Sequence, residues 1–320
     1  MSPSSIICIS VNPALDRRVR LPKLAVGSVN RATHAEAVPG GKAAHVAMGL
    51  TSLGARALWL GFLGGAVGGY CAEQLRKAVT EVIAVRTTAT RVNVELIEAC
   101  GTVTEILDPG VPPGEVAQQE LIRTLEAALN SEWNGALTVI SGSLPTGVAP
   151  EYYATMINIA HHCGSKVLFD SSGSALEAGL SARPEFVKIN RHEAEAVFGE
   201  PIHDRASALR AASRLINQGA ASAALTLGAE GLVWLESERG PAWIANVPPM
   251  RCPSPVGCGD ATLAGFAYAF SQKMSGVEAI RLAAACGAAN CLAEIPGKIL
   301  FENVEALTPG IQVEQPDSNA

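Results

Sequence analysis

Five short, nearly continuous apolar runs constrain the fold of this 320-residue chain more than any other feature. They are SIICISV (5–11), ALWLGFLG (57–64), ALTVISGS (136–143), KVLFDSS (166–172) and EFVKIN (185–190). Runs of this kind are typical of strands that are covered on both faces. Each of the last four leads into a segment with helical spacing, so the sequence predicts an α/β fold with a doubly wound, mainly parallel sheet flanked by helices.

Two segments depart from this pattern. Residues 14–38 and 88–107 alternate apolar with polar or charged residues, as strands with one solvated face do. We predict that these segments form a small β lid attached to the main sheet. The sequence contains no internal repeat and no separating linker, so we expect residues 1–320 to form a single domain in which the lid segments are inserted.

The C-terminal third is predicted to add a strand, a turn and a strand over residues 223–237, followed by two helices rich in alanine and glycine at 257–273 and 276–294. The last ten residues, 311–320, are expected to be frayed.

The composition favours a small-molecule ligand. Charged residues make up 17% of the chain, the formal net charge is −6, and no dense Lys/Arg run suggests nucleic-acid binding. No apolar run reaches the roughly 18–20 residues of a membrane span, and the first residues lack the pattern of a secretory signal. We therefore expect a soluble, cytoplasmic protein without nucleic-acid or membrane partners. The eight cysteines form no C-x-x-C pair, so their spacing indicates neither a zinc knuckle nor a redox dithiol.

The stretch GCGD, residues 257–260, directly precedes a predicted buried helix. Helix N-termini carry unpaired N–H groups and a partial positive charge, which suit them to bind phosphate. Gly257 and Gly259 would let the backbone approach an anion, and Asp260 falls in the first turn. A carboxylate repels phosphate unless it takes a proton from an attacking hydroxyl, as in an alcohol kinase. An N-capping aspartate after a glycine turn explains the same residues equally well.

Several motifs, in the same order along the chain, resemble those of the PfkB (ribokinase-like) carbohydrate kinases. Within this family the resemblance is to the branch of 1-phosphofructokinase, tagatose-6-phosphate kinase and the minor 6-phosphofructokinase. The matching motifs are NPALD (12–16), VNRA (29–32), PGGK (39–42), RVNVELIE (91–98), SGSLPTG (141–147), DSSG (170–173), VKIN with HEAE (187–195), TLGAEG (226–231) and GCGD (257–260). The resemblance implies ATP as phosphoryl donor, Mg²⁺ as metal and a ketohexose phosphate as acceptor.

The resemblance also implies roles for individual residues. Asp260 would be the catalytic base, and the amides of Gly257, Cys258 and Gly259 would form the anion hole for the γ-phosphate. Lys42 and Arg91 are the candidates for the phosphate of the acceptor, although a lone cation is usually a solvated surface residue. The implied substrate contacts are Asp16, Gly40, Gly41, Lys42, His45, Arg91, Gly142 and Ser143; for Asp16 an ordinary Asx turn is the alternative.

On the nucleotide side, Asn190 and Glu193 match the family's N-x-x-E motif, which supports magnesium through water. A helix-capping asparagine with a first-turn glutamate is the alternative interpretation of these two residues. The segment from Cys286 to Asn290 is expected to pack against the adenine. The implied cofactor contacts are Lys188, Asn190, Thr226, Gly228, Gly231 and Asn290.

The chain departs from the family pattern at three functional positions. Ala43 and His45 stand where the family usually has glycine and asparagine, which leaves the choice of acceptor less certain than the reaction. Cys258 stands where alanine is usual, and a thiol at a helix N-terminus is predicted either to be reactive with a lowered pKa or to be buried and inert.

Fructose 1-phosphate, fructose 6-phosphate and tagatose 6-phosphate are the candidate acceptors. The alternatives are a kinase of a free sugar or nucleoside, and a sugar-phosphate-binding relative without catalysis. A homodimer formed through the lid is common in the family and is expected here.

Overall fold

The computed structural model describes residues 5–316 and contains a ten-stranded sheet. Its strands are β1 (Ser5–Ser10), β4 (Arg56–Gly64), β5 (Glu81–Thr87), β8 (Leu137–Ser141), β9 (Val167–Asp170), β10 (Phe186–Asn190), β11 (Ala223–Thr226), β12 (Leu232–Leu235), β13 (Ala242–Asn246) and β14 (Gln312–Glu314). Their order is β14-β13-β12-β11-β10-β9-β8-β1-β4-β5. The sheet is parallel from β5 to β11 and antiparallel from β11 to β14, which confirms the predicted mainly parallel sheet.

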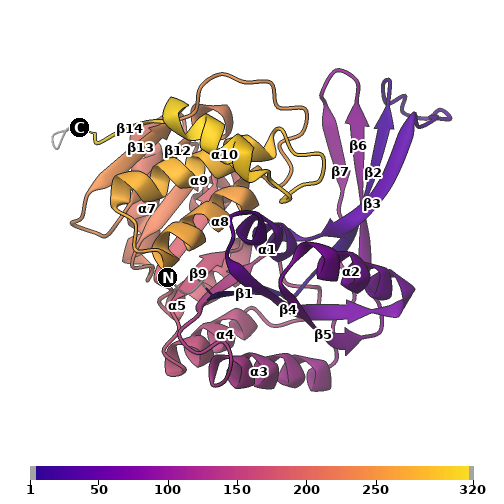
Figure 1. Ribbon diagram of the computed structural model, residues 1–320, viewed down its shortest axis with the longest axis horizontal. Helices are drawn as coiled ribbons and strands as arrows, with labels where there is room; N and C mark the ends of the chain where they lie inside the picture. Colours follow the sequence, from indigo (N-terminus) through magenta and orange to yellow (C-terminus); the bar gives the residue numbers. More distant parts are fainter. Residues whose placement is uncertain (1–4, 317–320) are drawn as a thin grey trace.

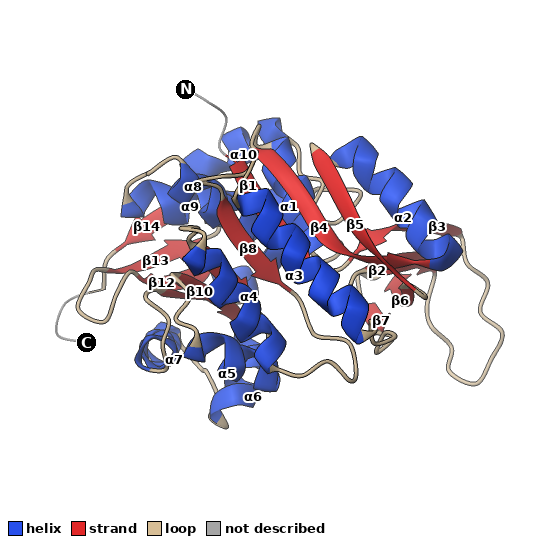
Figure 2. Ribbon diagram, turned by 90° about the horizontal axis from the view of Figure 1, so that it is seen from below, coloured by secondary structure: helices blue, strands red, loops and turns tan. Residues whose placement is uncertain are grey.

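Helices cover both faces of this sheet (Figure 2). One layer contains α1 (Lys42–Ser52), α2 (Gly65–Ala78), α8 (Cys258–Ser271), α9 (Gly276–Asn290) and α10 (Phe301–Leu307). The other contains α3 (Glu115–Leu129), α4 (Glu151–His162), α5 (Gly173–Ser181), α6 (Arg191–Phe198) and α7 (Arg205–Asn217). Two short 3₁₀ helices lie at Gly228–Glu230 and Thr308–Gly310.

The two helix layers explain why the strand sequences are apolar throughout. Side chains alternate across a strand, so Ile6 and Cys8 of β1 pack in one core whereas Ile7 and Ile9 pack in the other. All four side chains are fully buried.

A second, four-stranded sheet forms the predicted lid, with the order β3-β2-β6-β7. Its strands are β2 (Ala14–Leu21), β3 (His34–Gly40), β6 (Arg91–Glu98) and β7 (Val103–Ile106). The lid rises from one end of the large sheet, at the upper right of Figure 1. Its two faces differ because the sequence alternates: Asp16, Arg18, Asn93 and Glu95 are buried on the side toward the molecule.

The prediction of a frayed C-terminus is wrong for part of the segment. Residues Gln312–Glu314 form β14, and Val313 lies opposite Ala245 of β13. The edge of β13 offers backbone hydrogen bonds that a sequence pattern this short does not reveal. The final residues, 317–320, lie outside the described part of the chain.

None of the helices in the described range, 5–316, has the length and apolar character that crossing a membrane would require.

Strand order fixes where a ligand can bind. The strand β1 lies between β8 and β4, so the chain leaves β1 first to one side and later to the other. At such a switch point the loops after neighbouring parallel strands diverge and leave a crevice at the carboxyl edge of the sheet.

Candidate active site

A cleft of about 900 Å³ occupies this crevice, with the lid on one side and the start of α8 on the other. Most of the residues predicted from the sequence line it, although they come from distant parts of the chain. Those that line it are Asp16, Gly41, Lys42, His45, Arg91, Gly142, Ser143, Lys188, Asn190, Glu193, Thr226, Gly228, Gly231, Gly257, Cys258, Gly259 and Asp260. Gly40 and Asn290 do not line it.

The helix α8 begins at the floor of the cleft. Gly257 precedes it with a φ of 81°, a left-handed conformation that favours glycine, and a Cβ there would lie 2.9 Å from Pro296. Asp260 follows in the first turn, lines the cleft and is 7% exposed. The N–H of Cys258 donates to the carbonyl of Pro255 at 3.1 Å, so the predicted anion hole does not include this amide in the present conformation.

Asp260 has a partner that the motif alone does not reveal. Its Oδ2 accepts a hydrogen bond from Nδ1 of His45 at 2.8 Å. The other ring nitrogen of His45, Nε2, lies 3.7 Å from Oδ2 of Asp16 and makes no hydrogen bond within the described chain. The imidazole therefore lies between the predicted catalytic base and the predicted sugar-binding carboxylate.

This position favours the charged form of His45. Burial alone would lower the pKa of the imidazole, but the hydrogen bond to Asp260 and the charges of Asp260, Asp16 and Glu95 raise it above its ordinary value. The departure from the family pattern at residue 45 thus places in the site an imidazole whose protonated form is favoured by the neighbouring carboxylates.

The lid holds Asp16 in place. Asn93 lies beside it on the neighbouring strand and donates from Nδ2 to Oδ1 of Asp16 at 2.8 Å. Gly40 lies against the same carboxylate, and a Cβ at this position would overlap it. The contribution of Gly40 is therefore to make room for Asp16.

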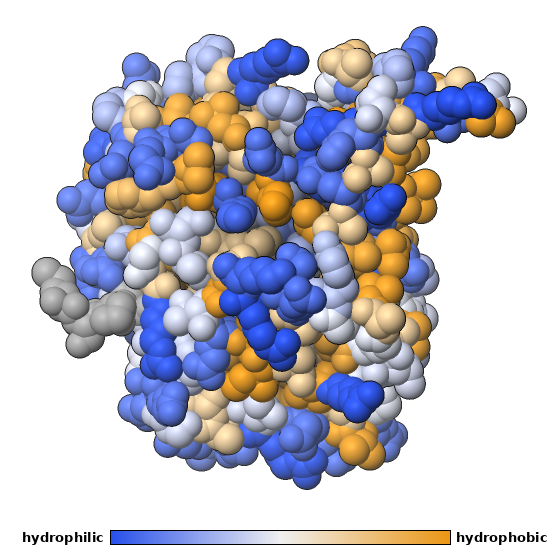
Figure 3. Space-filling view, turned by 45° about the vertical axis from the view of Figure 1, so that its right-hand side comes forward, coloured by the Kyte–Doolittle hydropathy of each residue, from blue (hydrophilic) through white to orange (hydrophobic). Residues whose placement is uncertain are grey.

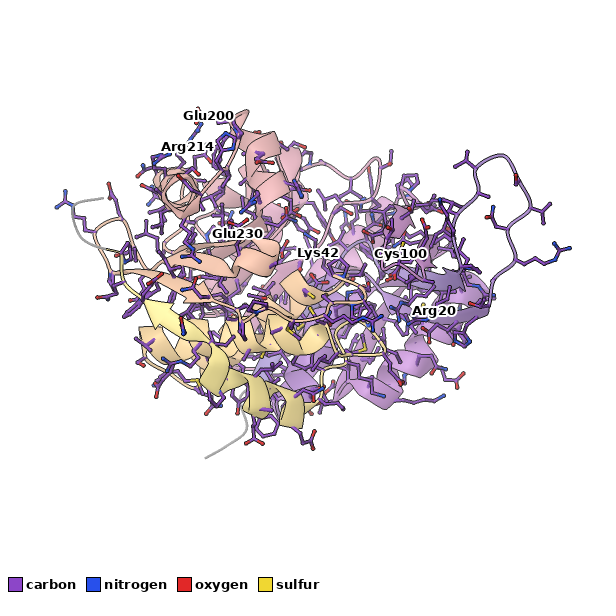
Figure 4. The ribbon with its side chains drawn as sticks, turned by 90° about the horizontal axis from the view of Figure 1, so that it is seen from above. Arg20, Lys42, Cys100, Glu200, Arg214 and Glu230 are labelled. Atoms are coloured by element: carbon purple, nitrogen blue, oxygen red, sulfur yellow. The ribbon has the colours of Figure 1, made fainter. Side chains whose placement is uncertain are left out.

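The predicted cation Lys42 is oriented toward Asp170 and Glu193. Its Nζ lies 2.7 Å from Oδ1 of Asp170 and 2.7 Å from Oε1 of Glu193. Lys42 is the first residue of α1, and Figure 4 shows it near the middle of the molecule. The structure therefore places this amine between two acids, on the Glu193 side of the cleft.

Asp170 is the central residue of this network, and the sequence analysis gave it no role. It is fully buried at the end of β9, and Lys188 lies 2.5 Å from its Oδ2. Burial would raise the pKa of Asp170, but Lys188 and Lys42 together hold it below its usual range. The signal was present in the sequence, since an aspartate that ends a buried parallel strand falls at the ligand edge of the sheet.

Lys188 connects this network to the start of α8, because its Nζ also donates to the carbonyl of Gly259 at 3.3 Å.

The alternative interpretation of Asn190 and Glu193 as a helix cap is confirmed. The Asn190 side chain accepts from the N–H of Glu193, and Glu193 Oε2 accepts from the N–H of Asn190, at 2.9 and 2.8 Å. Both residues still line the cleft, and the second carboxylate oxygen of Glu193 is the one that contacts Lys42.

Arg91 already has partners on its predicted phosphate-binding groups. Its Nε and Nη2 donate to the carbonyl of Asn12 at 3.2 and 3.0 Å, and Nη1 donates to the carbonyl of Asp108 at 2.6 Å. The guanidinium lines the cleft while it ties the lid strand β6 to the loop after β1.

Small residues form the far wall of the cleft. Gly228 and Gly231 flank the turn after β11, while Ala284, Gly287 and Ala288 of α9 face it. Asn290 braces this region: its Nδ2 donates to the carbonyl of Val256 at 2.8 Å, and its Oδ1 accepts from the N–H of Gly297 at 2.7 Å.

The pKa of Cys258 is raised, which favours the inert one of the two predicted alternatives for this thiol. Hydrogen bonding with Cys252 and Cys291, followed by burial, outweighs the helix dipole. In the same cluster, the interaction with Cys258 lowers the pKa of Cys252 to about 6.

The chain is similar to kinases over nearly its whole length. It is 33% identical to 1-phosphofructokinase of Haemophilus influenzae over 291 residues, which cover 89% of this chain and 90% of the relative. It is 35% identical to 1-phosphofructokinase of Xanthomonas campestris over 278 residues, covering 85% and 86% of the two chains. The structure of phosphofructokinase-2 from Escherichia coli in complex with fructose-6-phosphate superposes with a TM-score of 0.84 at 26% identity, covering 97% of this chain and 99% of that one. The pfkB family of carbohydrate kinases matches residues 8–297, and the chain therefore belongs to this family.

Proposed function

We propose that the protein transfers the γ-phosphoryl group of ATP to a hydroxyl of a ketohexose phosphate, with fructose 1-phosphate as the first candidate acceptor. The observation that carries the proposal is the position of Asp260, which lines the cleft in the first turn of α8 beside the glycines that precede it. Relatives with about a third of their residues identical are named 1-phosphofructokinase, which supports this choice of acceptor.

Each part of the cleft has a task in this reaction. Asp260 accepts the proton of the attacking hydroxyl, and the start of α8 stabilises the charge on the transferred group. Asp16 accepts hydrogen bonds from the sugar hydroxyls, and Nε2 of His45 can donate to an acceptor oxygen between the two carboxylates. The lid excludes water from the reacting groups.

A cleft of about 900 Å³ falls within the range of ligand sites and accommodates a nucleotide and a sugar phosphate side by side. The wall formed by Gly228, Gly231 and α9 carries only small side chains, which leaves space for the flat adenine and the ribose. Lys188, buried beside Gly259, supplies positive charge below the phosphates.

The residues present fit a hard divalent cation such as Mg²⁺. Glu193 and Asn190 both line the cleft and offer carboxylate and amide oxygens, the kind of ligand that Mg²⁺ prefers. We assign the support of the ion to Asn190 and Glu193, through water. When bound, the ion neutralises charge on the nucleotide phosphates.

One observation favours an unphosphorylated acceptor instead. The two cations expected to bind the acceptor phosphate both have partners within the protein. Lys42 contacts the carboxylates of Asp170 and Glu193, and Arg91 donates to backbone carbonyls. The acceptor side of the cleft also carries Asp16 and Glu105. A free sugar or nucleoside is therefore the second candidate.

ADP release, measured across a panel of acceptors, tests the proposal. We expect the highest kcat/KM with fructose 1-phosphate, followed by fructose 6-phosphate and tagatose 6-phosphate. A preference for fructose or a nucleoside would establish the second candidate. Absence of ADP release with every acceptor, although the sugar phosphates bind, would indicate a relative without catalysis.

We further propose that residues 1–320 form one kinase unit, located in the cytoplasm, that dimerises through the lid. The outer lid face supports pairing, because Val92 is 37% and Ile106 58% exposed there. Figure 3 brings the lid side forward and shows apolar side chains among the polar ones on this surface. Sedimentation of the protein and of a Val92→Asp variant tests the dimer, which the variant should dissociate.

A further inference from the structure

Three cysteines from separate parts of the chain meet at the wall of the cleft. Cys252 lies in the loop after β13, Cys258 is the first residue of α8, and Cys291 directly follows α9. Their three Sγ atoms all lie within 4.8 Å of one another. The spacing of these residues in the sequence gave no indication of a site, because the ends of α8 and α9 bring them together.

The geometry of the cluster resembles that of thiolate metal sites. The Sγ atoms of Cys258 and Cys291 are 3.6 Å apart. Zinc–sulfur bonds of about 2.3 Å place the sulfurs of a tetrahedral site about 3.8 Å apart, so this pair is already close to the required spacing. Cys252 lies on an exposed loop without regular structure, which can bring its sulfur closer.

The chemistry of the three groups also suits a metal. Thiolates are the protein ligands preferred by soft and borderline metals. The start of α8 places positive potential next to the sulfurs, which offsets part of the negative charge that three thiolates bring to the site. All three residues line the cleft, so an ion can reach them from solvent and retain a fourth ligand on the open side.

We propose that Cys252, Cys258 and Cys291 form a tris-thiolate binding site for a thiophilic divalent cation of the Zn²⁺ class. Binding replaces the thiol protons with the metal, and each proton is released to solvent. Three thiolates and one divalent ion leave one net negative charge at the cleft wall, next to the start of α8.

This position has a consequence for the proposed reaction. A metal there joins the loop before α8 to the end of α9, and the resulting negative charge repels the nucleotide phosphates. A metal ion bound at the three thiolates is therefore expected to inhibit phosphoryl transfer by competing with the binding of ATP. This consequence rests on the proposed function, whereas metal binding itself does not.

The binding test uses the full-length, tag-free protein, kept reduced with a non-chelating phosphine and freed of metal by a chelator. Zn²⁺ is titrated in competition with a chromogenic chelator, and Co²⁺ is added separately to record thiolate-to-metal charge-transfer absorption. We expect one ion per chain and an absorption band whose intensity corresponds to three thiolates.

Variants separate this site from adventitious binding. Cys252→Ser and Cys291→Ser should each weaken Zn²⁺ binding by about tenfold or more and reduce the charge-transfer band. Cys100→Ser is the matched control, because Cys100, labelled in Figure 4, is exposed in the turn between β6 and β7 and does not belong to the cluster. It should bind Zn²⁺ as the unchanged protein does. Thermal unfolding of each variant checks that it is folded.

Several results would overturn the proposal: no stoichiometric Zn²⁺ binding, an equal loss of affinity in Cys100→Ser, or a disulfide between two of the three cysteines that persists in the phosphine.

The effect of Zn²⁺ on activity is interpreted separately from its binding. Zn²⁺ should raise the KM for ATP in the unchanged protein and in Cys100→Ser, but at least tenfold less in Cys291→Ser. If neither the unchanged protein nor any variant releases ADP while Zn²⁺ still binds to the unchanged protein, the proposed function fails and the metal site stands.

Discussion

Replacing His45 by leucine tests the contact between the imidazole and Asp260. Leucine has similar bulk but no donor. The hydrogen bond is 2.8 Å long, and the two side chains are only 4% and 9% exposed. A hydrogen bond to a charged group contributes about 1.5–3 kcal/mol to stability. We expect the His45→Leu variant to lose about 1.5–3 kcal/mol of unfolding free energy in mild acid, where the imidazole is charged.

The loss should depend on pH in a defined direction. Burial lowers the pKa of His45, but Asp260, Asp16 and Glu95 outweigh it and raise the pKa above the ordinary value of 6.5. A group whose pKa is raised by folding contributes fully below its unfolded pKa, and the contribution is lost as the pH rises through its folded pKa. The stability deficit of the variant should therefore be largest below about pH 6.5, the ordinary pKa of histidine, and shrink as the pH rises through the raised pKa of the folded protein.

Urea unfolding, followed by tryptophan fluorescence at a series of pH values, measures this difference. His34→Leu is the control, because His34 lies exposed at the start of β3. A deficit that stays constant with pH, or that grows as the pH rises, would refute the assignment of a charged imidazole. So would an equal effect of the control.

Two further substitutions test the residues around this pair. Asp260→Asn should keep the KM for the acceptor and lower kcat by about 10²- to 10⁴-fold, the usual contribution of a general base; ADP release near the original rate would show that another group takes the proton. Gly40→Ala should displace the carboxylate of Asp16, which a Cβ would overlap, and lower kcat/KM by about a hundredfold. Gly69→Ala, where a Cβ meets nothing within 4 Å, should leave kcat/KM unchanged, and an equal loss in both variants would count against the role of Asp16.

Local patterns in the sequence were enough to predict the architecture. The apolar runs predicted a sheet covered on both faces, and the sheet has a helix layer on each side. The alternating segments predicted a lid with one solvated face, and β2, β3, β6 and β7 form it. These features depend on residues close in the chain, so their pattern is visible without the fold.

The position of the cleft could also be predicted from the sequence. Motif residues that follow parallel strands, such as Ser143 after β8 and Asn190 at the end of β10, must meet at one edge of the sheet. Other lining residues, such as Asp16 and Arg91 on the lid strands and Asp260 in α8, reach the cleft through the packing of the lid and of α8 against this edge.

Only the tertiary structure decided which of these side chains touch. His45 and Asp260 are 215 positions apart, and Lys42 and Glu193 are 151 apart. Cys258 and Cys291 meet because α8 and α9 pack side by side and bring the start of one helix to the end of the other. Contacts between distant segments depend on how whole helices and strands pack, and no local pattern carries that information.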